Sequence, residues 1–66
     1  MKALKRIVDD LINGNLVDAR KRVKRYSYMK LTEAFQEYAG YTLNKAYLAT
    51  CYVKSGNNFQ AYCDAE

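Results

Sequence analysis

The sequence predicts an all-α fold, a compact bundle of four helices plus a short C-terminal helix, in a single helical domain over residues 1–66. Two observations carry this prediction. Apolar residues recur at helical spacing along the chain, and three glycines, each near Asn, Ser or Thr, cut it into helix-sized pieces. There is no proline, and no segment alternates cleanly enough between turns to indicate a sheet.

The first predicted helix is amphipathic and ends at the sequence Asn-Gly-Asn. Lys5 and Asp9 belong to its polar side, and Gly14 suits the left-handed position that follows a helix. Its apolar stripe, with spacings of three and four residues, consists of Leu4, Ile7, Val8, Leu11 and Ile12.

The second predicted helix begins after Asn15, whose side chain can cap it, and Asp18 suits the positive N-terminal end. Ser27 marks a break or the cap of the next helix. The apolar stripe is thin and consists of Leu16, Ala19, Val23 and Tyr26.

The third predicted helix runs from about Met29 to Ala39 and is terminated by Gly40. Thr42 caps the fourth, residues 43–54, which is apolar nearly all round. A helix with so little polar surface is central and buried, or is partly covered by a partner.

A short fifth helix is predicted after Gly56. Asn57 and Gln60 have the spacing of a capping box, and Phe59, Tyr62 and Cys63 fall on one helical face.

The composition excludes several classes of site. The chain has no histidine, so it has neither the usual general base near neutral pH nor the commonest metal ligand. Cys51 and Cys63 alone make a poor zinc set. No signal peptide or membrane span is evident, and we therefore expect a cytoplasmic protein with reduced, mostly buried thiols.

The acidic residues do not form a convincing catalytic group. Asp9 and Asp10 are adjacent and point in different directions, whereas Glu33 and Glu37 share a helix face that favours a solvated pair. No glycine-rich phosphate loop and no nucleophile with a base are present. We expect no enzyme, no cofactor and no metal.

Positive charge is concentrated in residues 18–30, which hold six of the eleven Lys and Arg residues. The first thirty residues carry nine basic and three acidic residues (+6), and the remainder carries two and four (−2). The stripe is either a solvated helix face or a site for phosphates or carboxylates. Like charges four residues apart cost a helix stability, which an acidic partner would relieve. These pairs are Arg20/Lys24 and Lys21/Arg25.

Seven tyrosines are many for this length. Tyr38, Tyr47 and Tyr52 fit core positions with the hydroxyl directed outward. Tyr26 and Tyr28 follow the basic stripe, and tyrosine is enriched in protein interfaces. The predicted partner-binding residues are therefore Arg20, Lys21, Lys24, Arg25, Tyr26 and Tyr28.

Residues 34–56, "AFQEYAGYTLNKAYLATCYVKSG", resemble the helix-turn-helix of AraC-type regulators, and the later "GNNFQAY" keeps a glycine-to-tyrosine spacing seen there. Gln36 stands where that motif wants a small residue, and few polar side chains lie on the second helix. The resemblance implies sequence-specific DNA binding. The alternative function is therefore a nucleic-acid-binding regulator that uses this helix-turn-helix or the basic helix alone. Its candidate residues are Arg22, Lys30, Asn44 and Lys45.

The segments "NGNLVDARKRVKR" and "VKSGNNFQAYCDAE" look similar to small accessory proteins of tailed bacteriophages. The resemblance implies a non-catalytic protein that binds and modulates or inhibits a larger host protein or nucleoprotein complex. The excess of basic residues favours an acidic partner. A third interpretation is a homodimer in which a second copy covers the apolar fourth helix.

Overall fold

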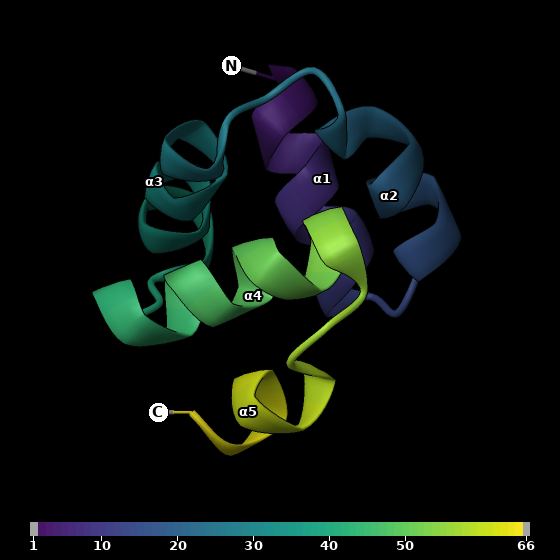
Figure 1. Cartoon of the computed structure of the whole chain (residues 1–66). Helices are drawn as coiled ribbons and strands as arrows, with labels where there is room; N and C mark the ends of the chain where they lie inside the picture. Colours follow the sequence, from purple (N-terminus) through teal and green to yellow (C-terminus); the bar gives the residue numbers. More distant parts are fainter. Residues whose placement is uncertain (1, 66) are drawn as a thin grey trace.

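The computed structural model describes residues 2–65, which form five α-helices (Figure 1). They are α1 (Lys2–Ile12), α2 (Leu16–Val23), α3 (Tyr28–Ala39), α4 (Leu43–Ser55) and α5 (Phe59–Asp64). The predicted all-α fold, four longer helices and a short last one, is confirmed.

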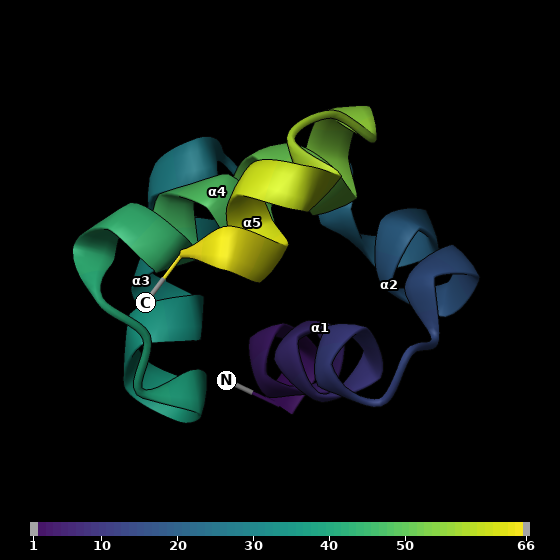
Figure 2. The ribbon, with the colours of Figure 1, turned by 90° about the horizontal axis from the view of Figure 1, so that it is seen from below.

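Four of the helices surround a common centre. Helix α1 packs against α2 and α3, and α4 crosses the opposite side and contacts both of them. In Figure 2, α2 and α3 lie on opposite sides, with α1 below and α4 above, and α5 lies against α4. The centre is filled by apolar side chains from all four, namely Ile7, Val8, Leu11, Ala19, Val23, Leu31, Ala34, Phe35, Ala46, Ala49 and Val53.

The ends of α3 and α4 are formed by the residues that the sequence predicts. The Ser27 hydroxyl accepts a hydrogen bond from the Lys30 amide, and the Thr42 hydroxyl accepts one from the Lys45 amide, each at 3.2 Å. Gly40 ends α3 at φ 70°, a left-handed conformation that costs glycine nothing. These caps are local, which explains why the sequence shows them.

Two predicted caps are wrong. The Asn15 side chain makes no capping hydrogen bond, and its backbone N–H instead donates to the Asp10 carbonyl at the end of α1. The capping box of Asn57 and Gln60 is not formed, because α5 begins after Asn58. The Gln60 amide donates to the Asp64 carboxylate at 3.1 Å, one turn further along α5.

Several apolar side chains predicted to be buried are exposed. Ile12 is the last residue of α1, where the chain turns away from the core, and Tyr47 of α4 is 51% exposed. Phe59 is 52% exposed. Cys51 is buried as expected, whereas Cys63 faces solvent because only one side of the short α5 packs on α4; both thiols are free.

A buried hydrogen bond joins α3 to α4. The hydroxyls of Thr32 and Thr50 lie 3.2 Å apart, and the Thr50 hydroxyl also donates to the Ala46 carbonyl at 2.9 Å. Both threonines are buried. Since a buried hydroxyl is costly without a partner, this pair favours one alignment of the two helices.

Aromatic side chains attach α5 to the bundle. The ring of Tyr41 stacks on Phe35 with centroids 6.1 Å apart, and its hydroxyl lies 2.9 Å from that of Tyr62. Tyr52 packs between Phe59 and Tyr62, at 4.9 and 6.0 Å. The pKa of the Tyr62 phenol is raised above its ordinary value of 10.0. Burial is the main cause, and the hydrogen bond to Tyr41 is the second.

We expect the attachment of α5 to weaken in alkali. Because the pKa of Tyr62 is higher in the folded chain, the stability that its protonated form contributes is complete below about pH 10 and is lost as the pH rises above that value. Urea unfolding followed by circular dichroism at about pH 9 and about pH 11 measures this loss. The Tyr62→Phe protein, which keeps the ring, should lose less stability between the two pH values than the wild type. An equal loss in both proteins would contradict the role of the Tyr62 hydroxyl, and Tyr28→Phe is the matched control.

Candidate basic interaction surface

The basic residues of α2 and the turn after it face solvent because the other side of the helix is in the core. Ala19 and Val23 are buried, whereas Arg20, Lys21 and Lys24 are exposed. Arg25 is also exposed. Within the part of the chain that the structure describes, none of these four cations forms an ion pair.

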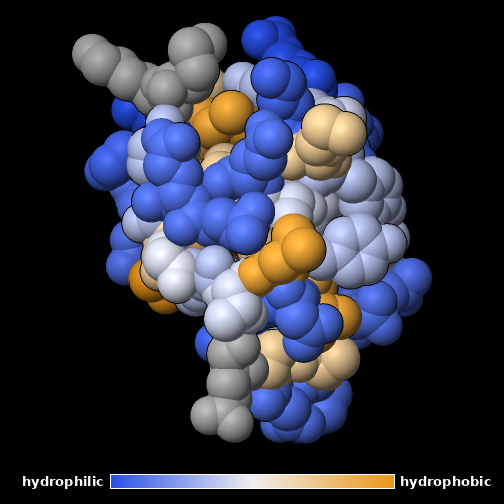
Figure 3. Space-filling model, turned by 90° about the vertical axis from the view of Figure 1, so that its left-hand side faces the viewer, coloured by the Kyte–Doolittle hydropathy of each residue, from blue (hydrophilic) through white to orange (hydrophobic). Residues whose placement is uncertain are grey.

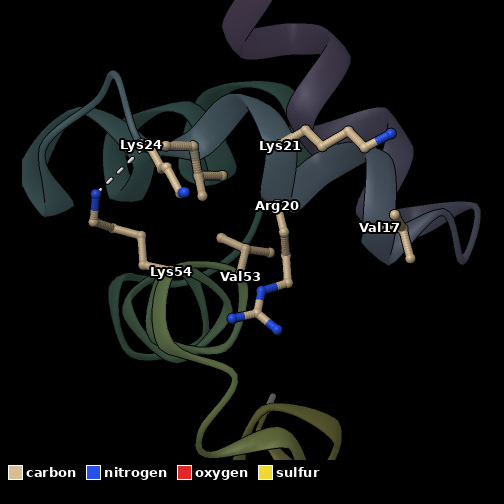
Figure 4. A pocket seen from close by; sticks show the side chains of 7 residues that line it. Val17, Arg20, Lys21, Lys24, Val53 and Lys54 are labelled. Carbon is tan, nitrogen blue, oxygen red and sulfur yellow. Dashed lines mark hydrogen bonds between the residues drawn. The ribbon is translucent and has the colours of Figure 1, made fainter.

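A groove lies between α2 and α4, with cationic walls and an apolar floor. It has a volume of about 370 Å³. Figure 4 shows the Arg20 side chain running past Val53, while Lys24 and Lys54 lie together on the other side of the groove. The lining residues are Val17, Arg20, Lys21, Val23, Lys24, Val53 and Lys54.

The Arg20 guanidinium lies against the glycine that ends α4. A Cβ placed on Gly56 would be 3.4 Å from Nη1 of Arg20. Gly56 has φ 75°, which favours glycine independently of the space. The distance is an ordinary van der Waals separation, so the positive φ, rather than the space beside Arg20, favours glycine at this position.

Lys54 is a structural member of this surface that is not among the predicted site residues. Its ammonium donates to the carbonyls of Val23 and Tyr26, at 3.3 and 2.7 Å, and lies 5.3 Å from the ring centroid of Tyr28. Carbonyls at a helix C-terminus lack intrahelical donors and carry partial negative charge. Lys54 supplies a charged donor to both carbonyls, and the Tyr26 amide also donates to the Val23 carbonyl at 3.0 Å. Helix α2 ends at Val23 rather than continuing to the predicted Tyr26. In the sequence, the feature that indicates such a role is a single lysine in the last turn of an otherwise apolar helix.

The predicted cations are divided between two hollows. Arg20 and Lys24 line the groove beside α4, whereas Arg25 lines a second hollow of about 330 Å³ that also includes Ala3 of α1. Lys21 borders both. The continuous basic stripe of the sequence is therefore a ridge with a depression on each side.

The two predicted tyrosines lie in different surroundings. Tyr26 is half-buried, packs against the core and borders the second hollow. Tyr28 is 41% exposed and lies beside Tyr47, with ring centroids 6.4 Å apart, on the surface between α3 and α4. Only Tyr26 lines a hollow together with cations of α2.

The residues of the nucleic-acid alternative are spread over three helices. Arg22 forms an ion pair with Asp10 at 2.9 Å, and Lys45 lies 4.8 Å from the ring centroid of Tyr41 and 5.6 Å from that of Tyr62. Lys30 and Asn44 are exposed. Helices α3 and α4 do follow one another through a short turn, but the exposed residues early in α4 include the apolar Leu43 and Tyr47.

The adjacent aspartates of α1 are both in ion pairs. Asp9 contacts Lys5 at 3.3 Å, and Asp10 contacts Arg22. In residues 2–65 no three His, Cys, Asp or Glu side chains are placed to hold a metal ion. None of the helices in this range is long and apolar enough to cross a membrane.

We expect Lys54→Met to destabilise the fold by about 1–3 kcal/mol, because it leaves the carbonyls of Val23 and Tyr26 without their charged donor. Lys30→Met is the matched control, since it removes the same charge from an exposed side chain and should change stability by less than about 0.5 kcal/mol. Urea unfolding at low micromolar concentration measures both. Equal stabilities of the two variants would show that Lys54 does not hold α2 to α4.

The chain gives no match to any protein-family model, curated protein or solved structure. We therefore infer its function from the surface that its own residues build.

Proposed function

We propose that this protein is a small non-catalytic interaction protein that binds an acidic surface of a larger protein or nucleoprotein complex through α2. The observation that carries the proposal is the exposure of Arg20, Lys21, Lys24 and Arg25 without an acidic partner among the described residues. Such a cluster attracts an acidic surface and orients it during encounter.

The exposed apolar side chain of Val17 in the groove favours a protein partner over a bare phosphate backbone. Val17 is 70% exposed at the edge of the groove, beside Lys21 and Arg20 (Figure 4), whereas Val53 and Val23 are buried beneath it. A partner segment with carboxylates beside an aliphatic side chain could contact both kinds of group. A phosphodiester chain offers charge but no aliphatic group for Val17.

The proposed partner is a host protein in the cytoplasm, if the similarity to bacteriophage accessory proteins reflects common ancestry. Binding would then modulate or inhibit that partner. Tyr26, one of the two tyrosines expected to anchor the partner, is partly buried against the core. It therefore offers less surface to a partner than the exposed cations do. We therefore assign the apolar contact to Val17 and to the aliphatic stems of the basic residues.

Charge reversal tests the proposal. Arg20→Glu/Lys24→Glu should lower the affinity for the partner by about tenfold to a hundredfold, because two attractive contacts become repulsive. The matched control is Lys5→Glu/Arg6→Glu, which makes the same change in net charge on α1, away from the groove. Recovery of the partner on a tagged copy, followed by titration with the purified partner, measures the effect. Equal losses in both variants would assign the effect to net charge, and unchanged binding in both would remove α2 as the interface.

Direct nucleic-acid binding is the second candidate, because the exposed cations of α2 and of the turn after it could equally contact phosphates. If four of them do so, the affinity should fall about a hundredfold between roughly 50 and 200 mM salt, because binding releases counterions and their release is less favourable into a more concentrated salt solution. Titration of duplex and single-stranded oligonucleotides at these two concentrations measures the slope. Tight, salt-sensitive binding that is lost in Arg20→Glu/Lys24→Glu would place nucleic acid ahead of a protein partner.

A further inference from the structure

A second surface, formed by α3 and the start of α4, carries a groove of different chemistry. Its volume is about 350 Å³. Met29 is 70% exposed and Leu43 is 64% exposed, and these two lie with Tyr28 and Tyr47 around it. Figure 3 faces this side of the molecule and shows hydrophobic patches among hydrophilic ones. Exposed apolar side chains that gather in this way mark an interaction surface.

The charges beside the groove have a definite order along α3. Lys30, Glu33 and Glu37 are exposed and follow one another at i, i+3 and i+7, so they form one stripe with a basic start and an acidic end. Glu33 also lines the groove, and neither it nor the Lys30 ammonium forms an ion pair among the described residues.

We infer that this surface binds a second copy of the chain, with the two α3 helices antiparallel about a two-fold axis. A two-fold interface places the same patch on both subunits, so the patch must complement itself. Antiparallel alignment brings Lys30 of each copy toward the acidic end, Glu33 and Glu37, of the partner's α3. The apolar residues beside the stripe then meet their own equivalents and leave water.

The small size of the chain adds to this inference. A 66-residue domain buries a limited fraction of its surface, and covering an exposed apolar groove adds to the buried area. The contact involves α3 and α4, and so it leaves the basic residues of α2 free. The inference therefore does not depend on the proposed function of α2.

Sedimentation velocity over a range from about 5 to 500 μM tests the apolar part of the contact. The wild-type chain should shift from monomer to dimer within this range. Met29→Ser/Leu43→Ser should raise the dissociation constant at least about tenfold, because two exposed apolar side chains are no longer buried on association. Ile12→Ser/Val17→Ser is the matched control, since it removes two side chains that are 52% and 70% exposed on α1 and α2. It should leave the dissociation constant within about twofold of wild type.

Charge exchange tests the antiparallel geometry independently. Lys30→Glu makes the whole stripe acidic, and Glu33→Lys/Glu37→Lys makes it entirely basic. Each variant alone should dissociate at least about tenfold more readily than wild type, and an equimolar mixture should recover the dimer because opposite stripes then face each other. Recovery on mixing is not expected from variants that are simply misfolded.

Three results would overturn the inference. The first is a wild-type chain that remains monomeric up to about 500 μM, and the second is equal weakening by the groove variant and its control. The third is a dimer that the charge variants leave intact or that their mixture fails to restore. If wild type is monomeric yet the groove binds an added basic, apolar peptide of alternating Leu and Lys, the occupant is a different protein.

Discussion

The position of the basic surface depends on the hydrogen bonds that the ammonium group of Lys54 donates. The ammonium binds the carbonyls at the C-terminal end of α2, ends that helix at Val23 and ties it to the last turn of α4. A half-buried cation is unfavourable when it lacks partners, and here two carbonyls and the ring of Tyr28 compensate it. Because α2 is fixed in this way, Arg20 and Lys24 stand beside α4 and form a groove with it rather than an isolated helix face.

The remaining contacts build the bundle around this connection. The hydroxyl pair of Thr32 and Thr50 aligns α3 with α4, and the hydroxyl pair of Tyr41 and Tyr62 attaches α5. Polar contacts thus link helices that share only a small apolar core. In a domain of this size, such contacts contribute a larger share of the specificity of packing than they would in a larger core.

The features predictable from the sequence are those determined over one or two turns of the chain. The helical spacing of Leu31, Ala34 and Phe35, the caps at Ser27 and Thr42, and the left-handed Gly40 all belong to this group. The exposure of the basic residues also follows from the thin apolar stripe of α2. Local spacing therefore predicted most of the fold and which residues of α2 face solvent.

The errors arise where a distant contact overrides the local pattern. The end of α2 depends on Lys54, thirty-one residues after Val23. Asn15 was predicted as a cap, but its backbone closes α1 instead. The exposure of Cys63 depends on which side of α5 meets α4, and the division of the basic stripe into two hollows depends on the positions of α1 and α4. None of these relations is expressed in the spacing of neighbouring residues.

The position of Arg20 beside Gly56 affects the conformational entropy that the arginine side chain loses on binding. A free arginine side chain samples many rotamers, and fixing it on binding costs about 1.5–2 kcal/mol. The guanidinium of Arg20 lies close to the end of α4, with Nη1 3.4 Å from the position that a Cβ on Gly56 would take, so the end of α4 excludes some of its rotamers before any partner arrives. Lys54 is the more restricted cation of the groove, because two carbonyls hold its ammonium group, but those bonds already occupy it. Arg20 has no such bond within the described residues and should lose less side-chain entropy on binding than an arginine with no neighbour.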